Sequence, residues 1–354
     1  MYSLRRYILW IVPALLCTAC GGRVGSSVVP PPTSPPVPPP FIAGHGTLAV
    51  IDVADPKTKT VRLFRPDSDH EFATIITHGE RYQPNSITFD HRGHLYVGVN
   101  DTNFPGKYTV TEFKVNGLER IREITDLPGW NRSSVVTDDQ NYLYVNTKAF
   151  LGGDIKIYKP NADRKPCLEI KDTGNPITTL AAHDTLWVAS EVVHGAFLDG
   201  YELRSRKSKF SHSIKGVESS KIAVNADGSW AAVFLRNLLS PEWAVNVFSA
   251  KTGFLRQIIK GKNLKAMAGD GASTIYVSES GPGRVFRCDF QHCPVYFATN
   301  SNNPAALAVN PRNRNLYIAN RDAGNVQVYH PGQSHPFLTI APGKFEPTGL
   351  AIEP

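Results

Sequence analysis

The sequence has little that would build helices. Outside the first twenty residues, no twelve-residue stretch shows the 3.6-residue apolar periodicity of an amphipathic helix. It also lacks a glycine-rich phosphate-binding loop, a histidine-rich metal motif, and a serine, histidine and aspartate in the order of a known hydrolase motif. These absences argue against a helical fold and leave no recognisable nucleotide-binding or hydrolytic motif.

Charge and composition are ordinary. The chain has 354 residues, of which 41% are hydrophobic and 19% charged, which fits a globular protein with a sizeable core. Its formal net charge is +7, but the basic residues are scattered. The densest group is Arg204, Arg206, Lys207 and Lys209, at an expected hairpin tip. We interpret it as a solvated loop, with a patch for anionic lipid, glycan or nucleic acid as the alternative, and we expect no nucleic-acid partner.

The N-terminus has the pattern of an export signal. Arg5 and Arg6 precede a short apolar run from Ile8 to Leu16, too short to be interpreted first as a spanning helix. The segment Leu16-Cys17-Thr18-Ala19-Cys20 resembles the lipobox of bacterial lipoproteins, although Cys17 stands where leucine is usual. The resemblance implies a signal peptide over 1–19 and lipidation of Cys20. The alternative is an ordinary secreted protein cut near Ala19.

Residues 20–43 are expected to join the lipid to the folded body. Proline dominates this stretch, in the runs Pro30-Pro31-Pro32, Pro35-Pro36 and Pro38-Pro39-Pro40. Such a sequence favours an extended polyproline II spacer. Gly21 after the lipid acceptor favours the outer membrane, so the sequence predicts a lipid-anchored protein of the cell envelope that faces away from the cytoplasm.

A short apolar phrase recurs about every 44 residues through the rest of the chain. Its copies are Leu48-Ala49-Val50, Leu95-Tyr96-Val97, Leu143-Tyr144-Val145, Leu186-Trp187-Val188, Trp230-Ala231-Ala232, Ile275-Tyr276-Val277 and Leu316-Tyr317-Ile318. Around each copy lie three further short strands separated by Gly, Pro and Asn turns. Four-stranded units at this period predict an all-β fold, a β-propeller of seven blades over 44–354, with six as the alternative.

The two ends of the repeat region complement each other. The first unit begins at its second strand, at Leu48, and the chain ends on a lone first strand, Thr348 to Glu353. We expect the two to pair in one blade and close the ring, which removes free sheet edges. Leu316 to Asn320, Asn325 to Tyr329 and Pro347 to Ala351 resemble the NHL and YVTN-type repeats of bacterial exported propellers. That resemblance implies the fold but no single activity.

Two cysteines flank an expected hairpin turn. Cys288 and Cys293 enclose Asp289 to His292, and an exported compartment permits a disulfide between them. Their spacing does not resemble a common zinc pattern. Cys167 remains, expected as a small buried apolar residue.

Candidate binding residues follow the second strands. In a propeller, the loops after second strands and before first strands gather on one face, the funnel face. The candidates there are Asn100, Asp101, Asn146, Ser190, Glu191, His194, Arg236, Asn237, Glu279, Asn320, Arg321 and Asp322. They could line a polar funnel, although Asn and Asp after a strand commonly cap turns. By contrast, Asp90, Asp138, Asp270 and Glu353 are expected in or beside tight turns on the opposite face.

One phrase also raises an enzymatic alternative. Ala189-Ser190-Glu191 and Val277-Ser278-Glu279 are similar to a phrase of the streptogramin lyases, which are seven-bladed propellers. That resemblance implies Glu191 and Glu279 near Ca²⁺ or Mg²⁺, with His194 as a base. The sequence departs from the family after Glu279, where Ser280 to Gly283 contains no histidine. A calcium-dependent sugar lactonase is the related possibility.

The sequence therefore predicts a non-enzymatic, monomeric scaffold that binds a small molecule or a protein at the funnel face and needs no cofactor. A metal-dependent lyase or lactonase is the alternative. The sequence names neither the ligand nor the partner.

Overall fold

The computed structural model describes residues 46–354 except for short internal gaps at 78–81, 102–105, 130–133, 150–151, 161–163, 172–173, 193–194, 204, 216, 238–241, 300 and 342. The predicted signal peptide, Cys20 and the proline-rich tether lie outside the described residues. Over the described residues, no helix is long and apolar enough to cross a bilayer.

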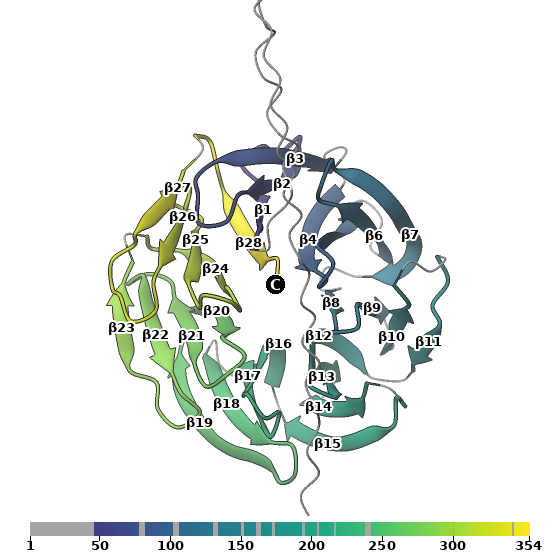
Figure 1. Ribbon diagram of the computed structural model, residues 1–354. Helices are drawn as coiled ribbons and strands as arrows, with labels where there is room; N and C mark the ends of the chain where they lie inside the picture. Colours follow the sequence, from purple (N-terminus) through teal and green to yellow (C-terminus); the bar gives the residue numbers. More distant parts are fainter. Residues whose placement is uncertain are drawn as a thin grey trace, which may run out of the picture. The chain divides into compact units, whose positions relative to one another are not determined.

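Seven four-stranded antiparallel sheets are arranged as blades around a central axis (Figure 1). Blade 1 contains β1 (Leu48–Asp52), β2 (Lys59–Phe64), β3 (Glu71–Thr77) and β28 (Pro347–Ile352); blade 2, β4 (Tyr82–Phe89), β5 (His94–Asp101), β6 (Gly106–Lys114) and β7 (Glu119–Gly129); blade 3, β8 (Val135–Thr137), β9 (Leu143–Ala149), β10 (Gly152–Tyr158) and β11 (Leu168–Ile170); blade 4, β12 (Asn175–Ala182), β13 (Thr185–Val192), β14 (Gly195–Glu202) and β15 (Ser208–Lys215); blade 5, β16 (Val217–Val224), β17 (Trp230–Asn237), β18 (Trp243–Ser249) and β19 (Gly253–Gly261); blade 6, β20 (Leu264–Gly269), β21 (Ile275–Glu279), β22 (Arg284–Cys288) and β23 (Val295–Ala298); blade 7, β24 (Pro304–Val309), β25 (Leu316–Asn320), β26 (Asn325–Tyr329) and β27 (Leu338–Ile340). The predicted seven-bladed propeller is confirmed.

The ring closes through the two ends of the chain, as predicted. The last strand, β28, pairs antiparallel with β1, so that Leu48 lies opposite Ile352 and Val50 opposite Leu350. Beyond the strands, the Glu353 amide donates to the Thr47 carbonyl at 2.9 Å. Each innermost strand also contacts the next around the whole circle, from β28 through β4 and back. The closed ring therefore leaves no gap between first and last blade.

Apolar side chains fill the spaces between blades. The core consists of seven clusters of buried residues, and each cluster is shared by two neighbouring blades. Alternation along the second strands explains this arrangement, because successive side chains point to opposite faces of a sheet. In β5, Leu95 and Val97 pack against blade 1, whereas Tyr96 packs against blade 3. The residues of the repeated phrase thus pack each blade against both of its neighbours.

One copy of the phrase is shifted from the predicted position. In blade 5, Ala231 pairs with Val224 and faces blade 4, as Leu95 pairs with Phe89 and faces blade 1. The equivalent phrase therefore begins at Ala231 and not at Trp230. Ala232 takes the place of the aromatic residue found in most other blades. The sequence placed the start of the phrase at Trp230 because a large apolar residue begins this strand, as leucine begins β9 and β25.

The turns after the first strands are capped by acidic or amide side chains, as expected. Asp90, Asp138 and Asp270 each accept hydrogen bonds from two backbone amides of their own turn, at 2.8–3.0 Å. In blade 3 the Tyr144 hydroxyl also donates to Asp138 at 2.8 Å. A side chain of this kind satisfies turn donors that the ladder leaves open. Near the same face, Glu353 Oε2 accepts a hydrogen bond from the Thr47 backbone amide at 3.3 Å.

The cysteine pair lies on the periphery of blade 6. Cys288 and Cys293 form a disulfide across the turn between β22 and β23. The Cys288 side chain is buried. Cys167, which we expected to be buried, is instead a free and exposed thiol, because it precedes the short outer strand β11 and not an inner strand.

Candidate functional site

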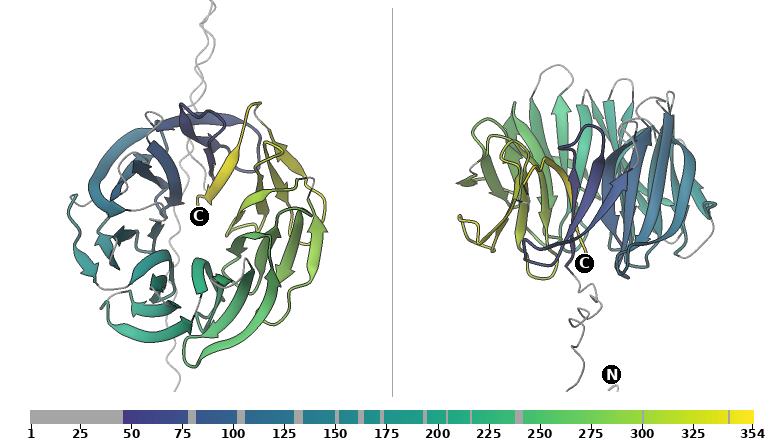
Figure 2. Two further views of the ribbon diagram at one scale, coloured as in Figure 1. Left: turned by 180° about the vertical axis from the view of Figure 1, so that it is seen from behind. Right: turned by 90° about the horizontal axis from the view of Figure 1, so that it is seen from above.

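The candidate residues lie where the second strands end, on the funnel face. Asn100 and Asp101 end β5, Asn146 lies on β9, Ser190 and Glu191 on β13, Arg236 and Asn237 on β17, Glu279 on β21 and Asn320 on β25, with Arg321 and Asp322 in the loop after β25. His194 lies outside the described residues. Figure 2 shows the strands of all blades standing side by side, with loops at both ends.

Several of these side chains hold strands together. The Asn146 side-chain amide donates to Ser134 Oγ at 2.8 Å, which connects β9 to the residue before β8. The Asn320 amide donates to Asn325 Oδ1 at 2.9 Å and to Gln327 Oε1 at 3.0 Å, both on β26. Asn146 and Asn320 are completely buried. These contacts join neighbouring strands, and neither side chain reaches the surface.

Glu279 is bound by an arginine of its own blade. Arg284 Nε and Nη2 each lie 2.7 Å from Glu279 Oε2, and Glu279 is only 9% exposed. A guanidinium thus occupies one side of the group that the lyase resemblance would use for a metal. Glu191 lies on blade 4, two blades away from Glu279 on blade 6. Among the described residues, neither belongs to a group of three or more possible metal ligands.

Arg321 and Asp322 line an open hollow on the funnel face. This hollow, of about 440 Å³, lies between blades 7 and 1 and is lined by Ala54, Arg321 to Gly324 and Gly343 to Glu346. Arg321 pairs with Glu346 through its Nε at 2.5 Å. Asp322 accepts a hydrogen bond from the Asn303 amide at 3.0 Å. Both side chains remain exposed. Of the predicted site residues, these two line a hollow of the surface.

Sequence reasoning missed a buried cluster of charges in blade 2. His94 Nδ1 lies 2.8 Å from Glu112 Oε1 and 3.6 Å from Asp90 Oδ2. Both carboxylates are at most 1% exposed. Among the described residues, this is the one group whose ligand atoms are close enough to hold a metal ion. The available signal was Glu112 itself, a charged residue within the strand segment Thr111 to Phe113.

Two arginines already neutralise this cluster. Arg92 Nη2 lies 2.7 Å from Asp90 Oδ2, and Arg122 Nε donates to Glu112. Burial acts to raise the pKa of Glu112, but the hydrogen bond with His94 and the charge of Arg122 outweigh it and leave that pKa below its ordinary value. Two carboxylates facing two guanidiniums leave no net negative charge for a divalent cation. The cluster therefore fits a structural ion network, not a metal site.

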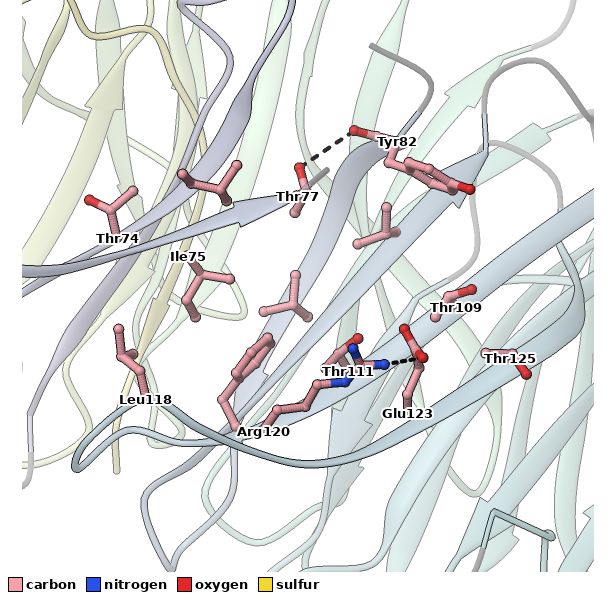
Figure 3. Close-up of a pocket in the computed structure, with 14 residues that line it drawn as sticks. Thr74, Ile75, Thr77, Tyr82, Thr109, Thr111, Leu118, Arg120, Glu123 and Thr125 are labelled. Atoms are coloured by element: carbon pink, nitrogen blue, oxygen red, sulfur yellow. Dashed lines mark hydrogen bonds and ion pairs between the residues drawn. The ribbon is translucent and has the colours of Figure 1, made fainter. Parts of the chain in front are cut away.

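An apolar hollow lies between blades 1 and 2. It has a volume of about 610 Å³, and its walls come from β3, β4, β5, β6 and β7. Figure 3 shows threonines of β6 and β7 along one wall and Ile75 on the other, with the Arg120–Glu123 ion pair beside them. Blades diverge toward the rim, and small side chains such as Thr109 and Thr111 leave that space open. It has the size of a small-molecule cleft, and the two charged residues among its described lining, Arg120 and Glu123, pair with each other.

Comparison with known proteins identifies the fold alone. A scan of protein-family models and a search of curated proteins find no match.

The chain is similar in structure to other propellers. One is hydrazine synthase of Kuenenia stuttgartiensis, at a TM-score of 0.64 and 14% identity, covering 86% of this chain and 99% of that one. Another is a protein from Lactobacillus plantarum, at a TM-score of 0.65 and 12% identity, covering 87% and 99%. A third is a periplasmic gluconolactonase of Pseudomonas aeruginosa, at a TM-score of 0.61 and 15% identity, covering 88% and 99%. Since one fold hosts many functions, these structural similarities support the propeller fold and indicate no activity.

Proposed function

We propose that this protein is an envelope scaffold, tethered to the membrane through Cys20, that binds a small molecule or a partner protein at the funnel face. The observation that carries the proposal is the exposed hollow at Arg321 and Asp322, presented by a closed ring. Loops on a rigid frame are the usual place for recognition in β proteins. The second strands beneath, such as β21 and β25, are buried along their full length and hold these loops in place.

A metal-dependent lyase or lactonase receives less support. The Glu279 carboxylate that such chemistry would need is paired with Arg284, and the buried cluster of blade 2 is paired with Arg92 and Arg122. The gluconolactonase likeness stands at 15% identity and carries the fold alone. We therefore propose recognition and not turnover.

Reversing the charges of the funnel hollow tests this proposal. We expect the double variant Arg321→Glu and Asp322→Lys to lose the proteins or small molecules that the full-length protein retains from detergent-solubilised envelopes, measured by quantitative mass spectrometry. A matched variant on the opposite face, Arg312→Glu with Asp139→Lys, should retain them; both of its residues are exposed. Equal retention by the two variants would contradict the assignment to the funnel face.

The anchor has its own test. If Cys20 carries the lipid, Cys20→Ala should move the protein from the membrane fraction to the soluble fraction, because the acyl chains supply the membrane affinity. The measurement is fractionation followed by immunoblotting, with Cys167→Ala as the control that leaves partitioning unchanged. Retention of Cys20→Ala in the membrane would refute lipid anchoring.

A further inference from the structure

Water reaches the axis of the propeller. The second strands β1, β21 and β25 are buried throughout, yet five of the six residues of β28 and four of the six residues of β24 are partly accessible. These are innermost strands, one from each blade, and each contacts the next around the ring (Figure 1). Solvent must therefore reach them along the central axis.

A bulge recurs in the innermost strands and turns one residue out of the ladder. The register shifts at the same place in six blades: between Pro347 and Gly349, Pro84 and Ser86, Pro176 and Thr178, Ser219 and Lys221, Leu264 and Ala266, and Pro304 and Ala306. A bulge leaves its extra residue unpaired and re-aims the side chain. In blade 6 that residue is Lys265, which is exposed although Leu264 and Ala266 on either side are buried.

A second lysine lies at the adjoining position of the next blade. Lys221 follows the bulge of β16 and pairs with Phe234, as Ala266 follows the bulge of β20 and pairs with Ser278. Strands β16 and β20 contact each other. Lys221 is also exposed, and because β16 is the innermost strand of its blade, that exposure is toward the axis. Two cations from neighbouring blades thus face the same solvent-filled space.

These lysines have no countercharge among the side chains that the structure describes around the axis. Lys221 forms no hydrogen bond or ion pair with a described residue, and no acidic group is among the causes that act on its titration. Of the described side chains on the seven innermost strands, Lys221 and Lys265 are the only charged ones. Glu218, the one acidic residue of these strands, lies opposite Arg236 in the backbone register, and its side chain is outside the described part of the structure. Exposed ammonium groups that no described carboxylate faces can form charge-assisted hydrogen bonds with an incoming anion.

We propose that the axial end of the funnel is a binding site for small anions, with Lys221 as the principal contact and Lys265 as the second. The ligand class is a carboxylate- or phosphate-bearing small molecule, because each lysine offers ammonium donors and no acceptor. The residues at the bulge positions of blades 7 and 1, Ala305 and Thr348, are small and uncharged. We therefore expect the charge of the ligand to decide which molecules bind. This inference rests on the proposed use of the funnel face and names the chemistry of its ligand.

Calorimetric titration of the full-length protein in detergent with citrate, and separately with inorganic phosphate, tests the site. We expect 1:1 binding of at least one of these probes, weakened tenfold or more by Lys221→Met and largely kept by Lys221→Arg. The matched control is Lys251→Met, an exposed lysine in the turn between β18 and β19 of the same blade. Absence of binding to either probe, or equal affinity in Lys221→Met and Lys251→Met, would overturn the proposal.

A stability readout separates loss of a contact from loss of the fold. Because Lys221 is an uncompensated cation, Lys221→Met should melt at the same temperature as the parent or higher, so weaker binding by a folded variant supports a direct contact. The charge reversal at Arg321 and Asp322 reports on the scaffold independently. If no anion binds but that reversal still abolishes retention, the anion site fails and the scaffold stands. If anions bind through Lys221 while the reversal changes nothing, the anion site stands and the scaffold proposal fails.

Discussion

A chain that ends at Phe345 is expected to lose its cooperative thermal transition, or to melt about 10 °C or more below the full-length protein. The truncation removes β28, which pairs with β1 and contributes Leu350 and Ile352 to the cluster between blades 7 and 1. It also exposes the edge of β1, whose five residues are now buried, and a bare apolar edge promotes aggregation. Circular dichroism and light scattering during heating measure both effects.

A variant of the truncated chain that carries β28 before β1 provides the control. Residues 346–354 placed directly before Gly46 would form a hairpin with β1, because Ile352 already lies opposite Leu48 and Glu353 bonds to Thr47. This rearranged chain should recover most of the lost melting temperature. If the truncated chain melts like the full-length protein, closure by β28 is not a main source of stability.

Glu112→Ala is expected to destabilise the protein by about 3–5 kcal/mol, the typical result of removing one partner from a buried ion pair. The Arg122 side chain is only 7% exposed and would keep its charge without the Glu112 carboxylate. His94 would lose its 2.8 Å contact as well. The matched control is Glu123→Ala in blade 2, whose partner Arg120 is half exposed, and a change below about 1 kcal/mol is expected there. Urea denaturation measures both variants.

The same residue should make stability depend on acid. The folded pKa of Glu112 lies below its ordinary value of 4.5, so the carboxylate binds fewer protons in the folded state than in the unfolded state. Its stabilisation is therefore complete above that ordinary value and is lost as the pH falls through the folded pKa. Glu112→Gln should differ from the parent most at neutral pH, and the difference should shrink as the solution is acidified. A difference that stays constant with pH would contradict the ion network.

The blades could be predicted from the sequence because their strands and turns are encoded by residues close together in the chain. Phrases such as Leu316-Tyr317-Ile318 alternate with turns such as Asn310 to Asn315, and the capping by Asp90 and Asp138 follows from residues within the same turn. The pattern failed where composition conflicts with register. In blade 5, Trp230 begins the strand, and only pairing with Ser249 and the packing of Ala231 against blade 4 show the shift.

The candidate site was predictable only in part. The sequence placed Arg321 and Asp322 after a second strand, and they line an exposed hollow. It could not show that Glu279 is held by Arg284, five residues along the chain but across a hairpin. Nor could it show that His94, Glu112 and Arg122 meet, because they come from three strands whose side-chain directions depend on register.

By itself, the sequence determined the repeat, the four strands in each blade and the pairing of the two chain ends, because spacing and alternation are properties of neighbouring residues. It favoured seven blades over six, and the structure shows seven. The tertiary structure alone decided which polar groups are buried and paired, and which cations face the axis without a partner. Those outcomes depend on the approach of strands far apart in the chain, and on bulges that turn a lysine such as Lys265 out of a strand that would otherwise have buried it.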